Sequence, residues 1–280
     1  MKKKMKKLYL ALTLSTVLFS SCMTQKEIKR AETIKDEIQE LRNLNKEKVE
    51  AGTQSPEIGK AVDSTYQKMQ EKLSVLQEAV KKNPTAISQL KKLKQKSQSY
   101  QTTIETFLKL YKLENFKSFE SSRFFKSGEY KIQTEDANII MNDLDPLIDK
   151  IIEVIEKDKA VNIEVIMGVY GYTDEQEIAV GGDLYKIITT MKGTKNLSQL
   201  ELNKALSELR AKSLADLVQT SVDKRKGNEA NKNHIFYNIN WLGRGFEKLP
   251  FKNMEVKKVD EKRRVVTVIW GVKPLLVDEE

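Results

Sequence analysis

Two short stretches in the second half of the chain carry side chains suited to holding a small charged ligand. Gly171-Tyr172-Thr173-Asp174 places a carboxylate directly after an apolar run, and Arg210 lies in a leucine- and alanine-rich stretch. A carboxylate attracts an ammonium group, and the planar guanidinium of arginine forms two parallel hydrogen bonds with a carboxylate. A zwitterionic molecule carries both partners. The pair therefore predicts a binding site and not a catalytic one.

The elements around these residues predict an α+β domain. Val161 to Val169 alternates and then turns apolar, which is typical of a buried strand leading to Asp174. Leu197 to Ser221 has the apolar spacing of a helix and carries Arg210. The same reasoning predicts extended pieces at 123–125 and 130–132, a helix at 136–155, and strands at 234–242 and 264–272. The order strand, helix, strand, helix, strand, strand predicts one sheet with two helices packed on it.

The first half of the chain predicts helices. From residue 24 to 111 apolar residues recur at steps of three and four, and Gly52 to Pro56 and Asn83-Pro84 predict turns. Three helices would bury these stripes by folding on each other or by pairing partly with another chain. The stripe residues are Ile34, Ile38, Leu41, Val62, Tyr66, Met69, Leu73, Leu76, Val80, Ile87, Leu90, Ile104, Leu108 and Tyr111. We expect this region to act as a spacer.

The N-terminus has the pattern of an export signal. Five lysines precede an apolar core from Leu8 to Phe19, which is too short to span a bilayer. The segment ends at Cys22, and Phe19-Ser20-Ser21-Cys22 resembles the site at which bacterial lipoproteins are cleaved and acylated. The alternative is an ordinary secretory signal with an incidental cysteine. Several acyl chains on Cys22 would hold the protein on a membrane, whereas one chain anchors only marginally.

Composition argues against several other classes of protein. The net charge of +9 includes five lysines of the signal, and without them 44 basic residues face 40 acidic ones, which is weak support for nucleic-acid binding. A single cysteine excludes an internal disulfide and a cysteine-based metal site. The one histidine, His234, lies in a predicted strand, and no glycine-rich phosphate loop is present. We therefore predict no enzyme, cofactor or metal.

About residues 120–273 resemble the OmpA-like peptidoglycan-binding domain. Five landmarks follow one another in the family's order. They are Phe124-Phe125 with Gly128, then Gly171 to Asp174, then Asn203 with Leu206-Ser207 and Arg210-Ala211, then Gly243 to Glu247 with Pro250, and finally Arg263-Arg264-Val265. The resemblance implies an OmpA-like sandwich that binds the diaminopimelate of a peptidoglycan stem peptide. It implies Asp174 and Arg210 as the principal ligands, with Thr173, Asn203 and Arg263 beside them; for Arg263 and Arg264, plain surface positions are the alternative.

Two departures from the family pattern bear on this site. An insertion at about 175–197 separates Asp174 from Asn203, and Val180-Gly181-Gly182-Asp183 predicts a hairpin turn within it. Lys262 stands where the family usually has Asn or Asp before the paired arginines. The insertion would lie beside the mouth of the site, where it could cover it, widen it or dock a protein.

Taken together, the sequence predicts a signal peptide at 1–21, a helical spacer at 22–113 and the OmpA-like domain at 114–280. The expected function is to tether the outer membrane to the cell wall, from the periplasmic side, with acylated Cys22 in the lipid and the stem peptide in the site. The alternative is a structural lipoprotein subunit of an envelope-spanning secretion machine, of the type VI kind, or of a motility complex. The helical region could also form homo- or hetero-oligomers.

Overall fold

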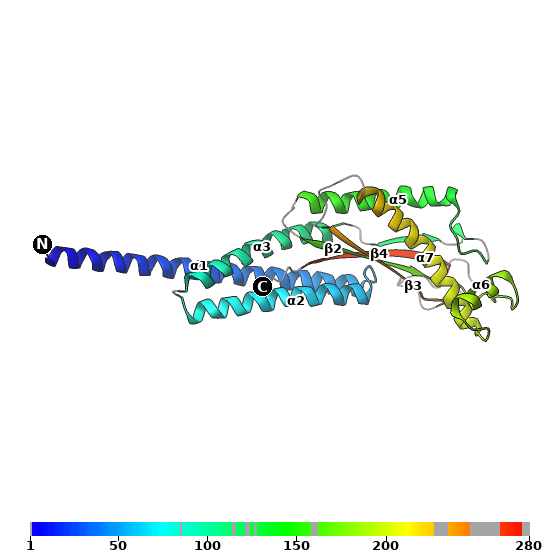
Figure 1. Cartoon of the computed structure of the whole chain (residues 1–280), viewed down its shortest axis with the longest axis horizontal. Coiled ribbons are helices and arrows are strands. Elements are labelled where there is room, and N and C mark those ends of the chain that lie inside the picture. Colours follow the sequence, from blue (N-terminus) through cyan, green and yellow to red (C-terminus); the bar gives the residue numbers. More distant parts are fainter. Residues whose placement is uncertain are drawn as a thin grey trace.

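The computed structural model describes residues 2–84, 86–113, 116–120, 124–125, 128–157, 162–226, 235–246 and 264–275, and the side chains of residues 2–22, 116–120 and 226 are not among those described. The chain has a mixed α+β architecture with a helical N-terminal region (Figure 1). Within the described parts, no helix is long and apolar enough to cross a membrane.

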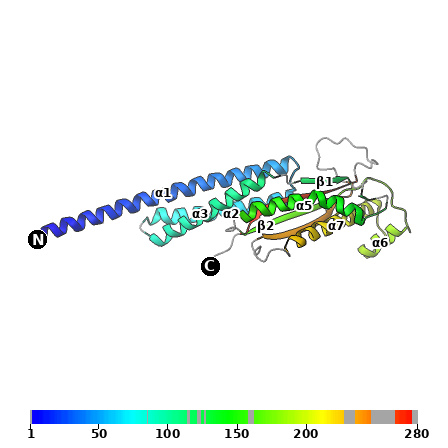
Figure 2. The ribbon, with the colours of Figure 1, turned by 90° about the horizontal axis from the view of Figure 1, so that it is seen from above.

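Three long helices form the N-terminal region. They are α1 (Lys2–Glu50), α2 (Pro56–Lys82) and α3 (Ile87–Tyr111), and α1 extends past the ends of the other two (Figure 2). Both predicted turns are confirmed. Helix α2 begins at a cap, because the Ser55 hydroxyl accepts a hydrogen bond from the backbone N–H of Ile58 at 3.1 Å and Pro56 needs no such partner.

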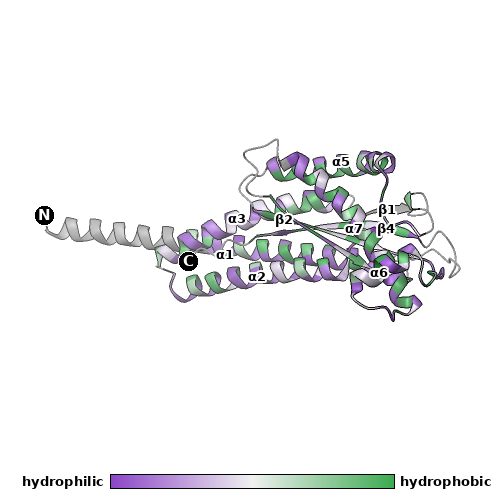
Figure 3. Cartoon of the chain, turned by 45° about the vertical axis from the view of Figure 1, so that its right-hand side comes forward, coloured by the Kyte–Doolittle hydropathy of each residue, from purple (hydrophilic) through white to green (hydrophobic). Residues whose placement is uncertain are grey.

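The predicted stripes pack against one another inside this bundle. Val62, Tyr66, Met69 and Leu73 of α2 are fully buried, and the rings of Tyr66 and Phe107 meet edge to face with centroids 5.9 Å apart. Hydrophobic residues recur along α2 and α3 between hydrophilic ones (Figure 3). Ile87 departs from the prediction: it is 79% exposed. As the first residue of α3, it lies at the end of the bundle, beyond the packed stripe.

A four-stranded sheet and three further helices make up the rest of the described residues. The elements are β1 (Phe116–Glu120), α5 (Thr134–Lys157), β2 (Ile163–Gly171), α6 (Asp183–Lys192), α7 (Gln199–Lys226), β3 (Ile235–Gly243) and β4 (Val265–Pro274). The strand order is β1-β4-β2-β3; β2 and β3 are parallel, whereas β4 is antiparallel to both β1 and β2. The predicted helix at 136–155 is α5, with Pro146 inside it.

The sheet lies between α7 on one face and α2 on the other. A Cβ added to Gly171 of β2 would meet α7 at Ser207, and one added to Gly271 of β4 would meet α2 at Ile58. Gly171 pairs with Val266, an odd number of positions from Gly271, so the two glycines face opposite ways. One continuous hydrophobic core includes residues of the bundle, the sheet, α5 and α7. The bundle is therefore part of the same packed body as the sheet.

Two local predictions are wrong. The first strand is Phe116–Glu120; within the predicted 123–125, Phe124 and Phe125 are buried but form no strand, and neither does the predicted 130–132. The insertion forms the helix α6 in place of a hairpin. Gly181 adopts φ +82°, Gly182 caps the helix in an extended conformation, and Gly193 ends it at φ +67°, so the glycines bound a helix.

Candidate functional site

Two glycines allow α7 to rest directly on the ends of β2 and β3. Gly171 and Gly243 are partners in the parallel ladder. A Cβ on Gly171 would lie 2.0 Å from the carbonyl oxygen of Ser207, and one on Gly243 would lie 2.4 Å from that of Lys204. Only glycine permits this approach, because real Cβ atoms essentially never come within 3.0 Å of another heavy atom. The contact sets the height of α7 above the sheet, and Arg210 follows Ser207 by three residues.

A set of short hydrogen bonds holds the loops that follow β2 and β3. The N–H of Thr173 donates to the carbonyl of Gly245 at 2.7 Å, and the N–H of Gly245 donates to the Ser207 hydroxyl at 2.8 Å. Ser207 in turn donates to the Lys204 carbonyl at 2.7 Å. Thr173 is 1% exposed and does not line the cavity described next. Its part is to fix the backbone that presents Asp174.

A cavity of about 220 Å³ brings together three of the predicted site residues, Asp174, Asn203 and Arg210. Arg264, from the start of β4, lines it as well. The remaining lining comes mainly from the insertion and α6: Gly128, Gln176, Glu177, Ile178, Ala179, Gly182, Asp183, Leu184, Tyr185 and Leu206. The insertion therefore forms one wall of the site, between the two stretches that the sequence singles out.

Asp174 is buried, and only one of its two carboxylate oxygens accepts a hydrogen bond from a described residue. One of its carboxylate oxygens, Oδ2, accepts a hydrogen bond from Nη2 of Arg264 at 2.9 Å, and both side chains are at most 9% exposed. The same nitrogen of Arg264 donates to Oε1 of Gln176 at 2.7 Å. The other oxygen of Asp174, Oδ1, accepts no hydrogen bond from any described residue. It is therefore open to a donor from a ligand.

Arg210 is the largest side chain among those that are almost fully buried. Its Nε donates to the carbonyl of Glu129 at 3.0 Å, and its guanidinium lies 5.3 Å from the centre of the Phe125 ring. Its two terminal nitrogens have no hydrogen-bond partner among the described residues. Burial, the largest cause, and repulsion by Arg264 lower the pKa of Arg210, Asp174 opposes them, and the net result is a pKa of about 10. The residue remains charged at neutral pH.

The charges of the cavity floor favour an anionic group on the ligand. The buried charges are two guanidinium groups, of Arg210 and Arg264, and the carboxylate of Asp174, which together carry one positive charge; the other carboxylates of the lining, of Glu177 and Asp183, are exposed to solvent. A buried cation without a full set of partners is costly, and a ligand carboxylate would relieve that cost. The open Oδ1 of Asp174 then suits an ammonium on the same ligand. The geometry thus fits the zwitterion expected from the sequence, with Arg264 as an additional member of the site.

The remaining predicted site residues have different outcomes. Asn203 is buried and donates through Nδ2 to the carbonyl of Gln176 at 3.2 Å, so it both lines the cavity and holds its rim. Arg263, Lys262 and His234 lie outside the described residues, as does the side chain of Cys22. Within the described part of the chain, no group of three or more His, Cys, Asp or Glu side chains could hold a metal ion.

Sequence reasoning missed several contributors to the site. Gln176 and the carbonyl of Glu129 belong to segments without a recognisable pattern, and only the fold brings them to the cavity. Arg264 carried a signal, since it follows Arg263 at the start of a predicted strand. Helix α6 carried one too, because Leu184, Ile187, Ile188 and Met191 recur at helical spacing.

Comparisons with known proteins do not assign this chain to a family. No family model matches the chain, and no curated protein matches it. Among solved structures, the chain is similar to the periplasmic domain of Helicobacter pylori MotB (residues 78–256), with 14% sequence identity over 56% of this chain and 74% of that chain and a TM-score of 0.28. A similarity this low carries no inference about the site.

Proposed function

We propose that this protein is an envelope lipoprotein that binds peptidoglycan non-covalently and tethers the outer membrane to the cell wall. The observation that carries the proposal is a cavity lined both by buried Arg210, whose two terminal nitrogens have no partner among the described residues, and by Asp174, whose Oδ1 has none there either. These two groups suit the carboxylate and the ammonium of a free amino-acid end. The diaminopimelate of an uncrosslinked stem peptide supplies both groups on one carbon atom.

The insertion gives this proposed site its own boundary. Tyr185 and Leu184 of α6 close one side of the cavity, and the carboxylates of Glu177 and Asp183 stand exposed on that side. A volume of about 220 Å³ has room for one amino-acid end and not for a long peptide. The site would therefore select a free end over a crosslinked one, since crosslinking consumes the ammonium.

The test is sedimentation of the protein with purified peptidoglycan, compared among variants that keep side-chain shape. Asp174→Asn and Arg210→Gln each remove one charge from the cavity, and each should lower the affinity at least about ten-fold, because a hydrogen bond to a charged group contributes about 1.5–3 kcal/mol. Arg225→Gln is the matched control. Arg225 lies on the same helix α7 but pairs with Asp145 and Asp149, away from the cavity. Melting temperatures show whether each variant is folded.

Small ligands sharpen this test. Calorimetry with diaminopimelate, with pimelate, which lacks ammonium groups, and with 1,5-diaminopentane, which lacks carboxylates, separates the two halves of the site. Of these three compounds, we expect only diaminopimelate to bind measurably. A folded wild-type protein that neither sediments with peptidoglycan nor binds diaminopimelate would remove the proposal.

One observation favours a second candidate, a structural subunit of an envelope-spanning complex. The edge strand β3 exposes Phe236, Trp241 and Leu242, each 40–48% accessible to solvent. Exposed apolar residues on an edge strand are suited to a protein contact. Crosslinking in cells from position 236 would capture a protein partner if this candidate holds. It would yield only the monomer if the wall alone is bound.

A further inference from the structure

The positive charge of this protein is concentrated at one end of the helical bundle. We define this basic end as residues 23–32 of α1 and 77–98, which span the end of α2 and the start of α3. It contains nine basic and three acidic side chains. The basic ones are Lys26, Lys29, Arg30, Lys81, Lys82, Lys91, Lys92, Lys94 and Lys96. The acidic ones are Glu27, Glu32 and Glu78.

This concentration is not a reflection of the average composition. Residues 22–280 carry a net charge of +4, whereas the basic end alone carries +6, so the remainder of the molecule is slightly acidic. From residue 87 to 104, α3 has four lysines and no acidic residue. Within this end, the ion pair of Lys81 with Glu32 is long at 3.8 Å and about half exposed, so it neutralises little of the positive charge. The end therefore attracts anions.

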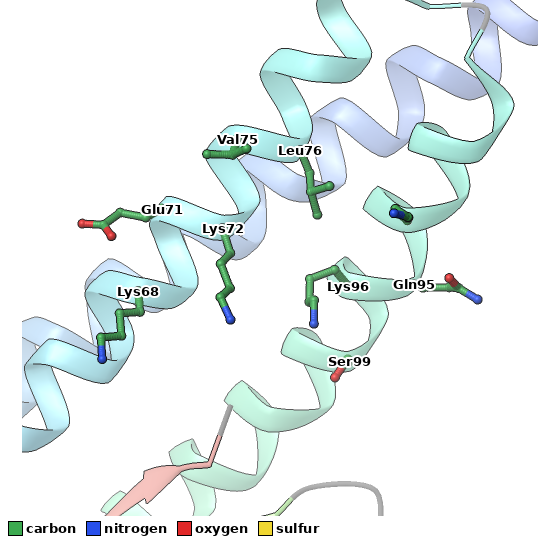
Figure 4. A pocket seen from close by; sticks show the side chains of 9 residues that line it. Lys68, Glu71, Lys72, Val75, Leu76, Gln95, Lys96 and Ser99 are labelled. Carbon is green, nitrogen blue, oxygen red and sulfur yellow. The ribbon is translucent and has the colours of Figure 1, made fainter. Parts of the chain in front are cut away.

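A groove between α2 and α3 continues this surface along the side of the bundle. It encloses about 800 Å³, and its lining includes Lys68, Lys72, Lys92 and Lys96, with Glu71 as its acidic member. Figure 4 shows Lys72 and Lys96 directed into the space between the two helices, and Leu76 projecting into the same space. A groove lined by four lysines and by the apolar side chains of Val75 and Leu76 suits an amphiphile with an anionic head.

Exposed apolar residues occur at the basic end and in the groove beside it. Met23 is 55% exposed, Val75 is 69% exposed and Ile87 is 79% exposed. Ile87 begins α3 at the turn, and Met23 follows the predicted acylation site directly. Basic residues together with exposed apolar ones are typical of protein surfaces that lie on membranes, where the apolar side chains enter the boundary of the headgroups.

The basic end also lies where the lipid would be. The turn between α2 and α3 stands at the point where α1 leaves the bundle (Figure 1). Hydrogen bonds fix this register: Gln77 donates to the carbonyl of Ile28 at 3.3 Å, and Arg30 donates to Gln101 at 2.6 Å. The turn is therefore level with the stretch that holds Cys22. This placement relative to the membrane rests on the proposed lipid anchor.

We infer that the basic end of the bundle binds the anionic phospholipid headgroups of the membrane in which Cys22 is anchored. Each lysine close to an anionic surface strengthens binding about five-fold, and the attraction falls off within about 10 Å. Lys91, Lys92 and Lys94 lie within about two helical turns of the start of α3, so they act together. The surface would hold the bundle end against the membrane and fix the direction in which the wall site points.

The experiment uses residues 22–280 with Cys22→Ser, so that neither acyl chains nor the signal contributes to binding; the packed bundle begins only at Thr24. Sedimentation is measured with vesicles of phosphatidylethanolamine and phosphatidylglycerol and with neutral phosphatidylcholine vesicles. One variant carries Lys→Gln at 81, 82, 91 and 92. The matched control carries Lys→Gln at 150, 157, 186 and 224, four exposed lysines of α5, α6 and α7.

We expect binding to the anionic vesicles only, with a loss of several hundred-fold, on the order of five-fold for each of the four lysines, in the bundle variant, little change in the control, and weakening as salt rises. Equal losses in the two variants, or no binding to anionic vesicles, would overturn the inference. An acidic protein helix would then be the favoured occupant of the groove. Sedimentation with peptidoglycan separates this result from the proposed function, because the bundle variant should bind the wall normally while Arg210→Gln should still bind vesicles.

Discussion

The close approach of α7 to the sheet makes a specific prediction for Gly171→Ala. The added Cβ would lie 2.0 Å from the Ser207 carbonyl oxygen and 3.3 Å from the Cβ of Ala211, whereas ordinary contacts begin at 3.4 Å. Backbone atoms cannot rotate away, so α7 must move by about 1.4 Å at this point. Overpacking of this kind costs about 1–3 kcal/mol. For a chain of this size, that corresponds to a fall in melting temperature of about 2–12 °C.

The same shift should disable the site while the protein stays folded. Arg210 follows Ser207 by three residues, so a movement of about 1 Å carries its guanidinium out of hydrogen-bonding range of a bound carboxylate. We expect the affinity for peptidoglycan or diaminopimelate to fall about ten- to a hundred-fold, which is the loss of one hydrogen bond to a charged group. Calorimetry and thermal unfolding of the same samples measure both effects.

Gly168→Ala on the same strand is the matched control. There the added Cβ would meet the far end of the Tyr170 side chain, at 2.7 Å, and not the backbone of α7. We expect a small change in melting temperature and normal binding. If Gly171→Ala behaved like Gly168→Ala in both assays, the argument that glycine sets the height of α7 and the position of Arg210 would be refuted.

The remaining predictions concern the packing of the bundle. Ser55→Ala should lower the free energy of unfolding by about 1 kcal/mol, because the first turn of α2 loses the cap on the N–H of Ile58; denaturant melts at constant m-value measure it. Phe107→Ala should cost about 3–5 kcal/mol, since a fully buried ring leaves a cavity, whereas Lys60→Ala on the exposed face should change little. Although burial opposes it, hydrogen bonds from its own backbone, Ser55 and Arg244 lower the pKa of Glu57 below 4.5. Between the folded-state and unfolded-state pKa values of Glu57, the unfolded state therefore binds more protons than the folded one. The free energy of unfolding should fall as the pH drops through this interval. Glu57→Gln should flatten this part of the pH profile.

The sequence predicted the elements whose pattern is local and missed those that depend on distant contacts. The helices of the bundle and the strand that leads to Asp174 repeat apolar residues at a regular period, and the structure contains both. The short strand Phe116–Glu120 has no such period. It is a strand because it pairs with β4, about 150 residues away, and that partner is invisible to a local reading.

The site shows the same division. Asp174 and Arg210 were recognisable because their residue types and neighbours carry a chemical meaning. Their surroundings depend on the fold: Arg264 reaches Asp174 only because β4 pairs with β2, and Gln176 is held by Asn203 across the insertion. Helix α6 was misread because two adjacent glycines favour a hairpin locally, while the apolar spacing after them, which is helical, determines the outcome.

The shared core of bundle and sheet has a mechanical consequence. Ile58 of α2 packs against Gly271 at the centre of the sheet, and Glu57 pairs with Arg244 at 3.1 Å, next to the loop that supports Thr173. A pull between a ligand in the cavity and the start of α1 would thus be resisted by packed side chains sliding past each other, and not by a slack linker. Such a body sets a stiff, nearly constant spacing between its two ends, because compressing or stretching it requires breaking its core.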